Sequence, residues 1–339
     1  MTKITMGKTG MCVEQNAFGA LPIQRVSLKE ATYILQKALD GGMNFFDTAR
    51  GYTDSEEKLG VAFEGKRDKY FLATKTPSQN AEGFWKDLET SLRLLKTDYI
   101  DVYQLHNPTF CPKPGDESGL YDAMLQAKKE GKIRFIGITN HRLNVAMEAI
   151  ESDLYSTLQF PFSYLSTDKD IELVDACKKH DMGFIAMKAL SGGLLTNSAA
   201  ACAWMSQFDN VVPIWGIQRE NELDEFLSYI PTPPALDAAM QATIDADLKE
   251  LQGNFCRGCG YCLPCPKEIN IPMCARASLL LKRAPSVALR GEEGQAMMKK
   301  IDDCIECGQC AKKCPYGLNP PELLKRDYAK YKAILAAES

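Results

Sequence analysis

The sequence lacks the features that mark membrane proteins, nucleic-acid-binding proteins and secreted proteins. Its longest apolar runs are only a few residues, whereas a membrane-spanning helix needs about 20. The net charge of −4 leaves no excess of basic residues for binding nucleic acid. The chain opens Met-Thr-Lys-Ile-Thr-Met without an apolar leader. We therefore expect a cytoplasmic protein that neither spans a membrane nor binds nucleic acid.

Cysteine is abundant but unevenly distributed. Nine of the 13 cysteines follow residue 255. The other four are Cys12, Cys111, Cys177 and Cys202. They are scattered, and we expect them to act as small buried apolar residues. Because the cytosol is reducing, we do not expect the clustered cysteines to form disulfides.

The clustered cysteines form two runs of the same design. The first reads C-R-G-C-G-Y-C-L-P-C-P from residue 256, and the second reads C-I-E-C-G-Q-C-A-K-K-C-P from residue 304. Cysteines at this spacing can surround one iron–sulfur cluster, and in two-cluster ferredoxins the fourth ligand comes from the other run. The pattern therefore predicts two [4Fe–4S] clusters. Paired C-x-x-C motifs also hold zinc, which is the alternative metal.

Exchange of the fourth cysteine gives two predicted ligand sets. They are Cys256, Cys259, Cys262 and Cys314 for the first cluster, and Cys304, Cys307, Cys310 and Cys265 for the second. The first run has one residue fewer before its fourth cysteine than the second, which makes Cys274 an alternative to Cys265. An internal repeat favours Cys265, because Pro, Asn and Pro follow Cys265 and Cys314 at the same offsets.

The region before the cysteine runs has about 250 residues, the usual size of an eight-stranded α/β barrel. Eight short strands alternate with helical patterns, at residues 14–20, 43–48, 70–75, 99–106, 135–140, 157–162, 183–190 and 211–217. Such alternation predicts a parallel sheet closed into a (β/α)8 TIM barrel. We expect this α/β barrel in residues 1–240, beginning with a hairpin, and a mainly helical, ferredoxin-like iron–sulfur domain in residues 241–339.

Polar residues stand at the C-terminal ends of six predicted strands. They are Asp47, Lys75, His106, Asn140, Gln159 and Lys188. In a barrel these strand ends meet around the active-site mouth, so the six are candidate site residues. His141 follows directly, and the sequence leaves open whether it lines this mouth or lies on the surface.

Four residues near this mouth suit the reduction of a carbonyl group. They are Asp47, Tyr52, Lys75 and His106. Reduction needs a hydride on carbon and a proton on oxygen, and Tyr52 can donate the proton. Free tyrosine has a pKa of about 10, and we expect the Lys75 ammonium to lower that pKa by stabilising the phenolate. Asp47 would hold Lys75, and His106 would hydrogen-bond the carbonyl oxygen.

These residues lie in segments that resemble the aldo-keto reductase family. The segments include F-D-T-A-R-G-Y-T-D-S-E-E-K-L-G from residue 46, F-L-A-T-K-T from residue 71 and D-V-Y-Q-L-H-N-P from residue 101. The resemblance covers residues 1–240, and with the cysteine runs the whole chain is similar to the branch of that family fused to a ferredoxin domain. It implies an oxidoreductase with a tyrosine acid–base and NAD(P)H bound at the strand ends.

The resemblance also implies the residues that bind the cofactor. Carried over by position, Thr139, Asn140 and Gln159 would hold the nicotinamide carboxamide, and Lys188 lies in a further matching segment. Where NADPH-binding members often place an arginine for the 2′-phosphate, this chain has Glu222, and Arg219 is the nearest cation. We therefore expect no strong preference for NADPH over NADH.

Two other functions remain open from the sequence. Clusters move single electrons whereas hydride transfer moves two, and a flavin is the usual converter. One alternative is therefore a ferredoxin-linked, flavin-dependent reductase served by a redox partner protein. The other is an electron-transfer module on an inert barrel, which the four polar residues argue against. The favoured function is an oxidoreductase acting on a small carbonyl or alcohol.

Overall fold

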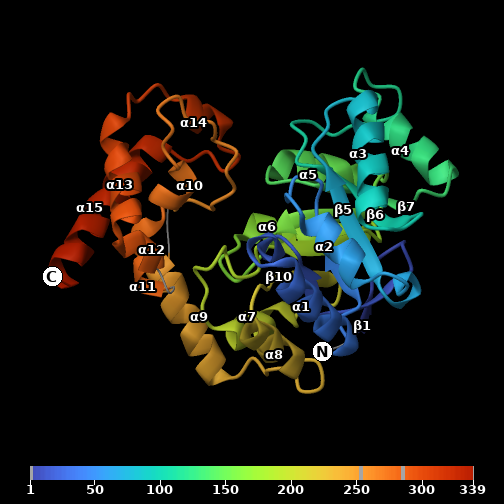
Figure 1. Cartoon of the computed structure of the whole chain (residues 1–339), viewed down its shortest axis with the longest axis horizontal. Coiled ribbons are helices and arrows are strands. Elements are labelled where there is room, and N and C mark those ends of the chain that lie inside the picture. The colour runs from blue at the N-terminus through green and yellow to red at the C-terminus, as the bar shows by residue number, and fades with distance from the viewer. Residues whose placement is uncertain (1–2, 252–254, 284–286, 339) are drawn as a thin grey trace. The chain divides into compact units, whose positions relative to one another are not determined.

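The structure is a computed structural model that describes residues 3–251, 255–283 and 287–338 (Figure 1). The chain divides into two compact units. The first comprises Met1–Ala189 and Ala199–Asp237, and the second comprises Leu190–Ser198 and Ala238–Ser339. We expected a single division at residue 240. The structure divides three residues earlier, and it also assigns the short segment Leu190–Ser198 to the second unit.

Eight parallel strands close into a barrel in the first unit, in the order β10-β3-β4-β5-β6-β7-β8-β9. They are β3 (Ala17–Gly19), β4 (Phe45–Asp47), β5 (Phe71–Thr76), β6 (Ile100–His106), β7 (Ile133–Thr139), β8 (Thr157–Pro161), β9 (Gly183–Met187) and β10 (Val211–Gly216). The predicted (β/α)8 barrel is confirmed. The largest difference at a strand start is in β3, which begins three residues after the predicted start at 14, whereas β7 begins two residues before its predicted start at 135.

Eight α-helices and two short 3-10 helices connect these strands. They are α1 (Leu28–Asp40), α2 (Ser55–Ala62), α3 (Ala81–Leu94), α4 (Leu120–Lys129), α5 (Leu143–Glu151), α6 (Asp168–Lys179), α7 (Ser198–Met205), α8 (Glu220–Ser228), η1 (Pro22–Arg25) and η2 (Arg67–Lys69). At the start of α1, the Ser27 hydroxyl accepts from the N–H of Glu30, and the Glu30 carboxylate accepts from the N–H of Ser27. This capping box satisfies backbone donors at the helix start.

The N-terminal hairpin closes one end of the barrel. Strand β1 (Lys3–Thr5) pairs antiparallel with β2 (Cys12–Glu14). Its apolar side chains, Ile4 and Val13 among them, pack with Phe45 and other residues from the N-terminal halves of the barrel strands. Cys12 is exposed on this hairpin, so the expectation that it is buried is wrong: its neighbour Val13 takes the inward position of the strand. Cys111, Cys177 and Cys202 are buried as expected.

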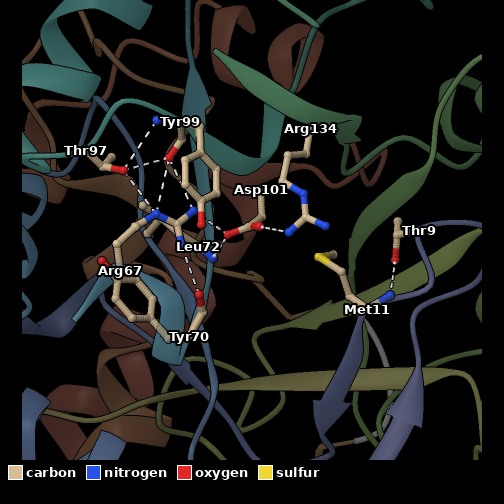
Figure 2. Close-up of polar contacts among 9 residues, drawn as sticks. All are labelled: Thr9, Met11, Arg67, Tyr70, Leu72, Thr97, Tyr99, Asp101 and Arg134. Carbon is tan, nitrogen blue, oxygen red and sulfur yellow. Dashed lines mark hydrogen bonds and ion pairs between the residues drawn. The ribbon is translucent and has the colours of Figure 1, made fainter. Parts of the chain in front are cut away.

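A buried carboxylate organises charged and aromatic side chains near the start of β6 (Figure 2). Asp101 is 1% exposed. It accepts from Nη2 of Arg67 at 2.5 Å, from Nη1 of Arg134 at 2.6 Å and from the N–H of Leu72 at 2.9 Å. The Arg67 guanidinium also lies 4.0 Å from the ring centroid of Tyr99. Since residues at the N-terminal face of such barrels serve stability rather than catalysis, this network is expected to be structural.

We expect Asp101→Asn to lower the free energy of unfolding by about 1.5–3 kcal/mol, the usual contribution of a hydrogen bond to a charged group. The amide keeps the shape of the side chain but removes the charge that Arg67 and Arg134 share. Denaturant unfolding followed by circular dichroism measures the change. Asp98→Asn is the matched control, because Asp98 is exposed nearby and its loss of charge should cost under about 0.5 kcal/mol. Equal stability of the two variants would show that the network contributes nothing.

The second unit is helical in its described residues. Its helices are α9 (Ala238–Leu251), α10 (Ile271–Cys274), α11 (Ala277–Arg283), α12 (Val287–Arg290), α13 (Glu292–Lys299), η3 (Lys300–Asp303), α14 (Gln309–Lys313) and α15 (Pro320–Glu338). The longest, α15, contacts α10 and α11. In residues 3–251, 255–283 and 287–338, no helix is both long and apolar enough to cross a membrane.

Candidate active site and cluster sites

The barrel brings together the four residues expected to act on a carbonyl. Asp47 ends β4, Lys75 lies near the end of β5 and His106 ends β6, while Tyr52 lies on the loop after β4. Nζ of Lys75 donates to Oδ1 of Asp47 at 2.6 Å and to the carbonyl of Thr48 at 2.6 Å. It lies 5.2 Å from the ring centroid of Tyr52. The Tyr52 and His106 rings meet edge to face, with centroids 6.0 Å apart.

The charges of this site are set by burial. Burial raises the pKa of Asp47 and lowers the pKa of Lys75, and their direct contact opposes both shifts. We expected the pKa of Tyr52 to lie below its usual value because of Lys75, and that expectation is wrong for the net shift. Burial, followed by the charge of Asp47, raises the Tyr52 pKa instead. Because burial is the larger cause of this raised pKa, Tyr52 remains a protonated phenol that can donate.

His106 is a neutral imidazole in this setting. Burial, followed by the positive charge of Lys75, lowers the pKa of His106 to about 3. A neutral ring still carries one N–H and can donate it to a carbonyl oxygen. His141 is buried, and burial together with the charge of Lys188 lowers its pKa well below the usual value. The sequence left the place of His141 open, and the structure puts it inside rather than on the surface.

Gln104 is a member of the site that the sequence reasoning missed. Its Nε2 donates to Oδ2 of Asp47 at 3.3 Å and to Oε1 of Gln159 at 2.9 Å. Nε2 of Gln159 in turn reaches Oδ1 of Asp47 at 3.5 Å. The available signal was the period-two alternation of β6, which places Gln104 on the same face as His106. The two amides fix the orientation of the carboxylate that holds Lys75.

The other expected cofactor residues follow β7 and β9. Thr139 ends β7, and its hydroxyl accepts from the N–H of Asn107 at 3.1 Å. Asn140 uses both ends of its amide: Nδ2 donates to the carbonyl of Pro108 in the loop after β6, and Oδ1 accepts from the N–H of His141 in its own loop. Lys188 follows β9 directly and has a positive φ of 57°.

Arg219 and Glu222 stand at the start of α8. Oε2 of Glu222 accepts from the N–H of Gln218 at 3.0 Å and from the N–H of Arg219 at 3.1 Å. Nη1 of Arg219 lies 3.7 Å from Oε1 of Glu222. The glutamate therefore caps the helix while it pairs with the arginine. This arrangement fixes a carboxylate beside the one cation that the sequence offered for a 2′-phosphate.

In the second unit, eight cysteines line two separate cavities. One cavity is lined by Cys256, Cys259, Cys262 and Cys314 together with apolar residues. The other is lined by Cys265, Cys304, Cys307 and Cys310, and Cys262 lines it as well. The first cavity thus receives three cysteines from the first run and one from the second, and the other receives three from the second run and two, Cys262 and Cys265, from the first. A thiol-lined, largely apolar space of this kind suits an iron–sulfur cluster.

The backbone repeats between the two cysteine runs. Gly258 and Glu306 occupy the same place in their runs and have φ of 65° and 51°. Gly260 and Gly308 correspond in the same way, with φ of 82° and 71°. After the fourth cysteine, Glu268 and Gly317 have φ of 53° and 63°. Cys265 and Cys314 therefore hold equivalent positions of a duplicated backbone, despite the missing residue in the first run.

Cys274 lies apart from both cavity linings. It ends α10, is fully buried, and its Sγ donates to the carbonyl of Met297 at 3.7 Å. Burial raises its pKa to about 12, which keeps the thiol protonated. In the part of the chain that the structure describes, no group of three or more His, Cys, Asp or Glu residues is arranged to hold a single metal ion.

Comparison with known proteins assigns both units. Residues 15–203, more than half of the chain, match the Aldo/keto reductase family. The chain belongs to the aldo/keto reductase family. Residues 255–319 of this reductase match the 4Fe-4S dicluster domain. The resemblance to the ferredoxin-fused branch is thereby confirmed, and the chain is an oxidoreductase of the aldo-keto reductase type.

Curated relatives of the reductase include enzymes that act on sugars. It is 32% identical over 218 residues to L-galactose dehydrogenase of Arabidopsis thaliana, covering 58% of this chain and 68% of that one. It is 30% identical over 240 residues to 6-dehydroglucose reductase of Novosphingobium aromaticivorans, covering 63% of this chain and 78% of that one. These matches concern the barrel rather than the whole chain.

Solved structures share the fold of the reductase. Aldo-keto reductase AKR11C1 from Bacillus halodurans has a TM-score of 0.65 and 23% identity, covering 73% of this chain and 96% of that one. An aldo-keto reductase from Klebsiella pneumoniae in complex with NADPH has a TM-score of 0.63 and 24% identity, covering 73% of this chain and 95% of that one. At these identities the likeness shows the barrel fold alone.

A buried glutamate braces the site of the reductase, and the sequence reasoning missed it as well. Glu56 on α2 is 1% exposed. Its Oε1 accepts from Thr74 on β5 and from Ser91 on α3, both at 2.7 Å, and its Oε2 pairs with Arg50. The N–H of Arg50 also donates to the carbonyl of Lys75 at 2.9 Å. Glu56 therefore fastens the loop that carries Tyr52 to the strand that carries Lys75.

Proposed function

We propose that this protein is an iron–sulfur aldo-keto reductase that reduces a carbonyl, or oxidises the corresponding alcohol, with Tyr52 as the acid–base. The observation that carries this proposal is the gathering of Asp47, Tyr52, Lys75 and His106 at neighbouring strand ends. A barrel without a catalytic role does not require a buried ion pair beside a tyrosine and a neutral histidine. Nicotinamide-dependent turnover by the anaerobically purified protein tests it, with a panel of aldehydes, ketones and sugars.

Side chains of this protein donate the proton and stabilise the charge that its transfer creates. When bound, a nicotinamide supplies the hydride for the carbonyl carbon. Tyr52 donates its phenolic proton to the carbonyl oxygen, while His106 donates a hydrogen bond to the same oxygen. The Lys75 ammonium, held by Asp47 at 2.6 Å, favours the phenolate that remains after the proton leaves. Gln104 and Gln159 keep Asp47 oriented throughout.

The cofactor contacts proposed for the nicotinamide are Thr139, Asn140 and Gln159, with Lys188 beyond them. Their support is position: Thr139 ends β7, Asn140 directly follows it, Gln159 lies within β8 and Lys188 directly follows β9. For the iron–sulfur centres we propose Cys256, Cys259, Cys262 and Cys314 for the first cluster and Cys304, Cys307, Cys310 and Cys265 for the second. The two cysteine-lined cavities support these sets, and the clusters would supply one-electron transfer.

We expect NADPH to bind no more than about tenfold tighter than NADH, a difference of about 1.4 kcal/mol. The fixed carboxylate of Glu222 repels a 2′-phosphate and holds Arg219 in an ion pair. Anaerobic fluorescence titration with both reduced cofactors measures the ratio. Glu222→Gln keeps an oxygen for the helix cap but removes the charge, so it should shift the ratio toward NADPH.

The result that would contradict this expectation is strong NADPH selectivity in the unaltered protein. The phosphate would then have a cation as its partner. Arg219→Gln would show whether that cation is Arg219, because its loss would weaken NADPH and leave NADH binding unchanged.

The depressed pKa of His106 predicts a stability that falls as pH falls. Unfolded histidine binds a proton below about pH 6.5, whereas His106 in the fold binds one only below about 3. The unfolded state therefore gains protons first, and the stabilising effect, complete above pH 6.5, is lost progressively toward pH 3. Between pH 7.5 and 5.5 we expect the unaltered protein to lose about 1 kcal/mol more than His106→Gln. Parallel losses in urea unfolding would show that His106 titrates normally.

A further inference from the structure

Arg276 is a cation that the second unit holds almost entirely buried. It is 8% exposed and lies between α10 and α11. Its Nε donates to the carbonyl of Pro272 at 3.1 Å, and its Nη1 donates to the carbonyl of Gly192 at 3.4 Å. Burying a charge is costly unless an anionic partner lies close. We therefore expect an anionic group close to the Arg276 guanidinium.

The first cysteine run supplies that partner. Gly258, between Cys256 and Cys259, lies against the guanidinium: a Cβ atom on it would fall 2.5 Å from Cζ of Arg276. The N–H of Gly258 itself donates to Sγ of Cys256 at 3.3 Å. Burial lowers the pKa of Arg276, and the charges of Cys256, Cys259 and the Asp327 carboxylate oppose that shift. The Arg276 guanidinium therefore lies against the loop that lines the first cavity.

A second glycine makes room for the same guanidinium. A Cβ atom on Gly192, which has φ of 66°, would lie 2.9 Å from Nη1 of Arg276. Gly192 belongs to Leu190–Ser198, the segment that follows Lys188 along the chain. Arg283 donates to another carbonyl of this segment, Leu194, at 3.1 Å, but it pairs with the carboxylates of Asp247 and Glu250. Of these two arginines, Arg276 is the one that faces cysteine sulfur.

The second cysteine run differs at the corresponding place. Glu306 stands where the first run has Gly258, and its exposed side chain pairs with Lys325. The backbone is the same at the two positions, with φ of 65° and 51°. A glycine is therefore needed in the first run for the space that Arg276 fills, not only for the turn.

We propose that Arg276 is a positioning residue that raises the reduction potential of the cluster held by Cys256, Cys259, Cys262 and Cys314. Reduction adds one electron, and so one negative charge, to that cluster. A fixed buried cation stabilises the more negative state, because net charge and hydrogen bonding near the sulfur atoms set cluster potentials. The same guanidinium ties this cluster loop to the segment following Lys188. The inference rests on the proposed cluster assignment.

A redox titration of the anaerobically purified full-length chain tests the proposal, with dithionite as the reductant and EPR as the readout. Cys265→Ser identifies the signal of the first cluster, because it removes a ligand of the second only. Arg276→Gln should lower the equilibrium constant for reducing the first cluster by at least about tenfold, or about 59 mV for one electron. The second cluster should change by less than about threefold, which is under about 30 mV.

Two further variants distinguish the effect of the Arg276 charge from other effects of the substitution. Arg276→Lys retains the charge and should keep the potential of the first cluster within about threefold of the unaltered protein. Arg283→Gln removes the other arginine that donates to Leu190–Ser198 and should leave both potentials unchanged. Equal shifts in the Gln and Lys variants, or none in either, would overturn the role of the charge. Loss of the first cluster from both Arg276 variants would also overturn it. Absence of clusters from the unaltered protein would instead refute the proposed cluster assignment.

Discussion

Replacing Tyr52 with phenylalanine should slow carbonyl reduction by a factor on the order of 10²–10⁴, the range for loss of a general acid. The ring stays, so its edge contact with His106 and its place beside Lys75 are kept. Only the proton that the carbonyl oxygen must receive is missing. Steady-state kinetics with the substrate found in the screen measures the loss. Most of it should fall on kcat, because the phenol acts in the transition state more than in binding.

Tyr121→Phe is the matched control for this experiment. The Tyr121 hydroxyl lies on α4 and donates to the carbonyl of Leu154 at 2.6 Å, away from the four catalytic candidates. Its loss should leave turnover within about twofold, since it touches no reacting group. Near-normal turnover by Tyr52→Phe would remove Tyr52 from the mechanism. Circular dichroism and iron content of both variants show whether the fold and the clusters survive.

The barrel was predictable because its signal is repeated. Eight apolar segments alternating with helical patterns leave few ways to build one core, and each unit reinforces the next. The ends of the elements were less certain. Strand β7 begins at Ile133 rather than at residue 135, since hydrogen bonding with β6 extends pairing to Ile100. The sequence pattern of one strand does not show how far the neighbouring strand extends, and so does not show where their hydrogen bonding begins.

The candidate active site was predictable from residue type and position at the strand ends. Its supporting contacts were not. Gln104 bonds to Asp47 and Glu56 bonds to Ser91 across segments that are far apart in the chain, and only folding brings them together. The pKa of Tyr52 was predicted in the wrong direction for the same reason. The sequence indicates that a lysine lies near the tyrosine. The burial of Tyr52 and its distance from the Asp47 carboxylate, which together raise its pKa, are set by the fold.

The second unit shows a similar division. The cysteine spacing predicted the two cysteine-lined sites, and the repeat after Cys265 and Cys314 predicted that these two cysteines are equivalent. Both predictions rest on local spacing, which sets the local backbone conformation. The assignment of Leu190–Ser198 to this unit had no such signal. Its contacts include those of Arg276 and Arg283, which lie more than 80 residues further along and donate to carbonyls of the segment. Arginine-to-carbonyl contacts leave no periodic pattern in a sequence.

Cys265→Ser should remove one of two clusters, whereas Cys274→Ser should leave both. The unaltered protein should contain about eight iron and eight sulfide per chain, the content of two four-iron cubes, and Cys265→Ser about four of each. Cys265 lines one cavity together with Cys304, Cys307 and Cys310. Serine keeps the size of the side chain but lacks the thiolate that binds iron. Iron and acid-labile sulfide analysis after anaerobic purification measures the loss.

Cys274→Ser is the matched control, because Cys274 is a buried thiol of the same unit whose Sγ donates to the carbonyl of Met297. The serine hydroxyl can make the same contact, so iron content and both EPR signals should persist. Cluster loss in this variant with an intact Cys265→Ser protein would mean that Cys274 is the ligand. Stoichiometric zinc without iron in the unaltered protein would contradict both cluster assignments, and would make the two cavities zinc sites.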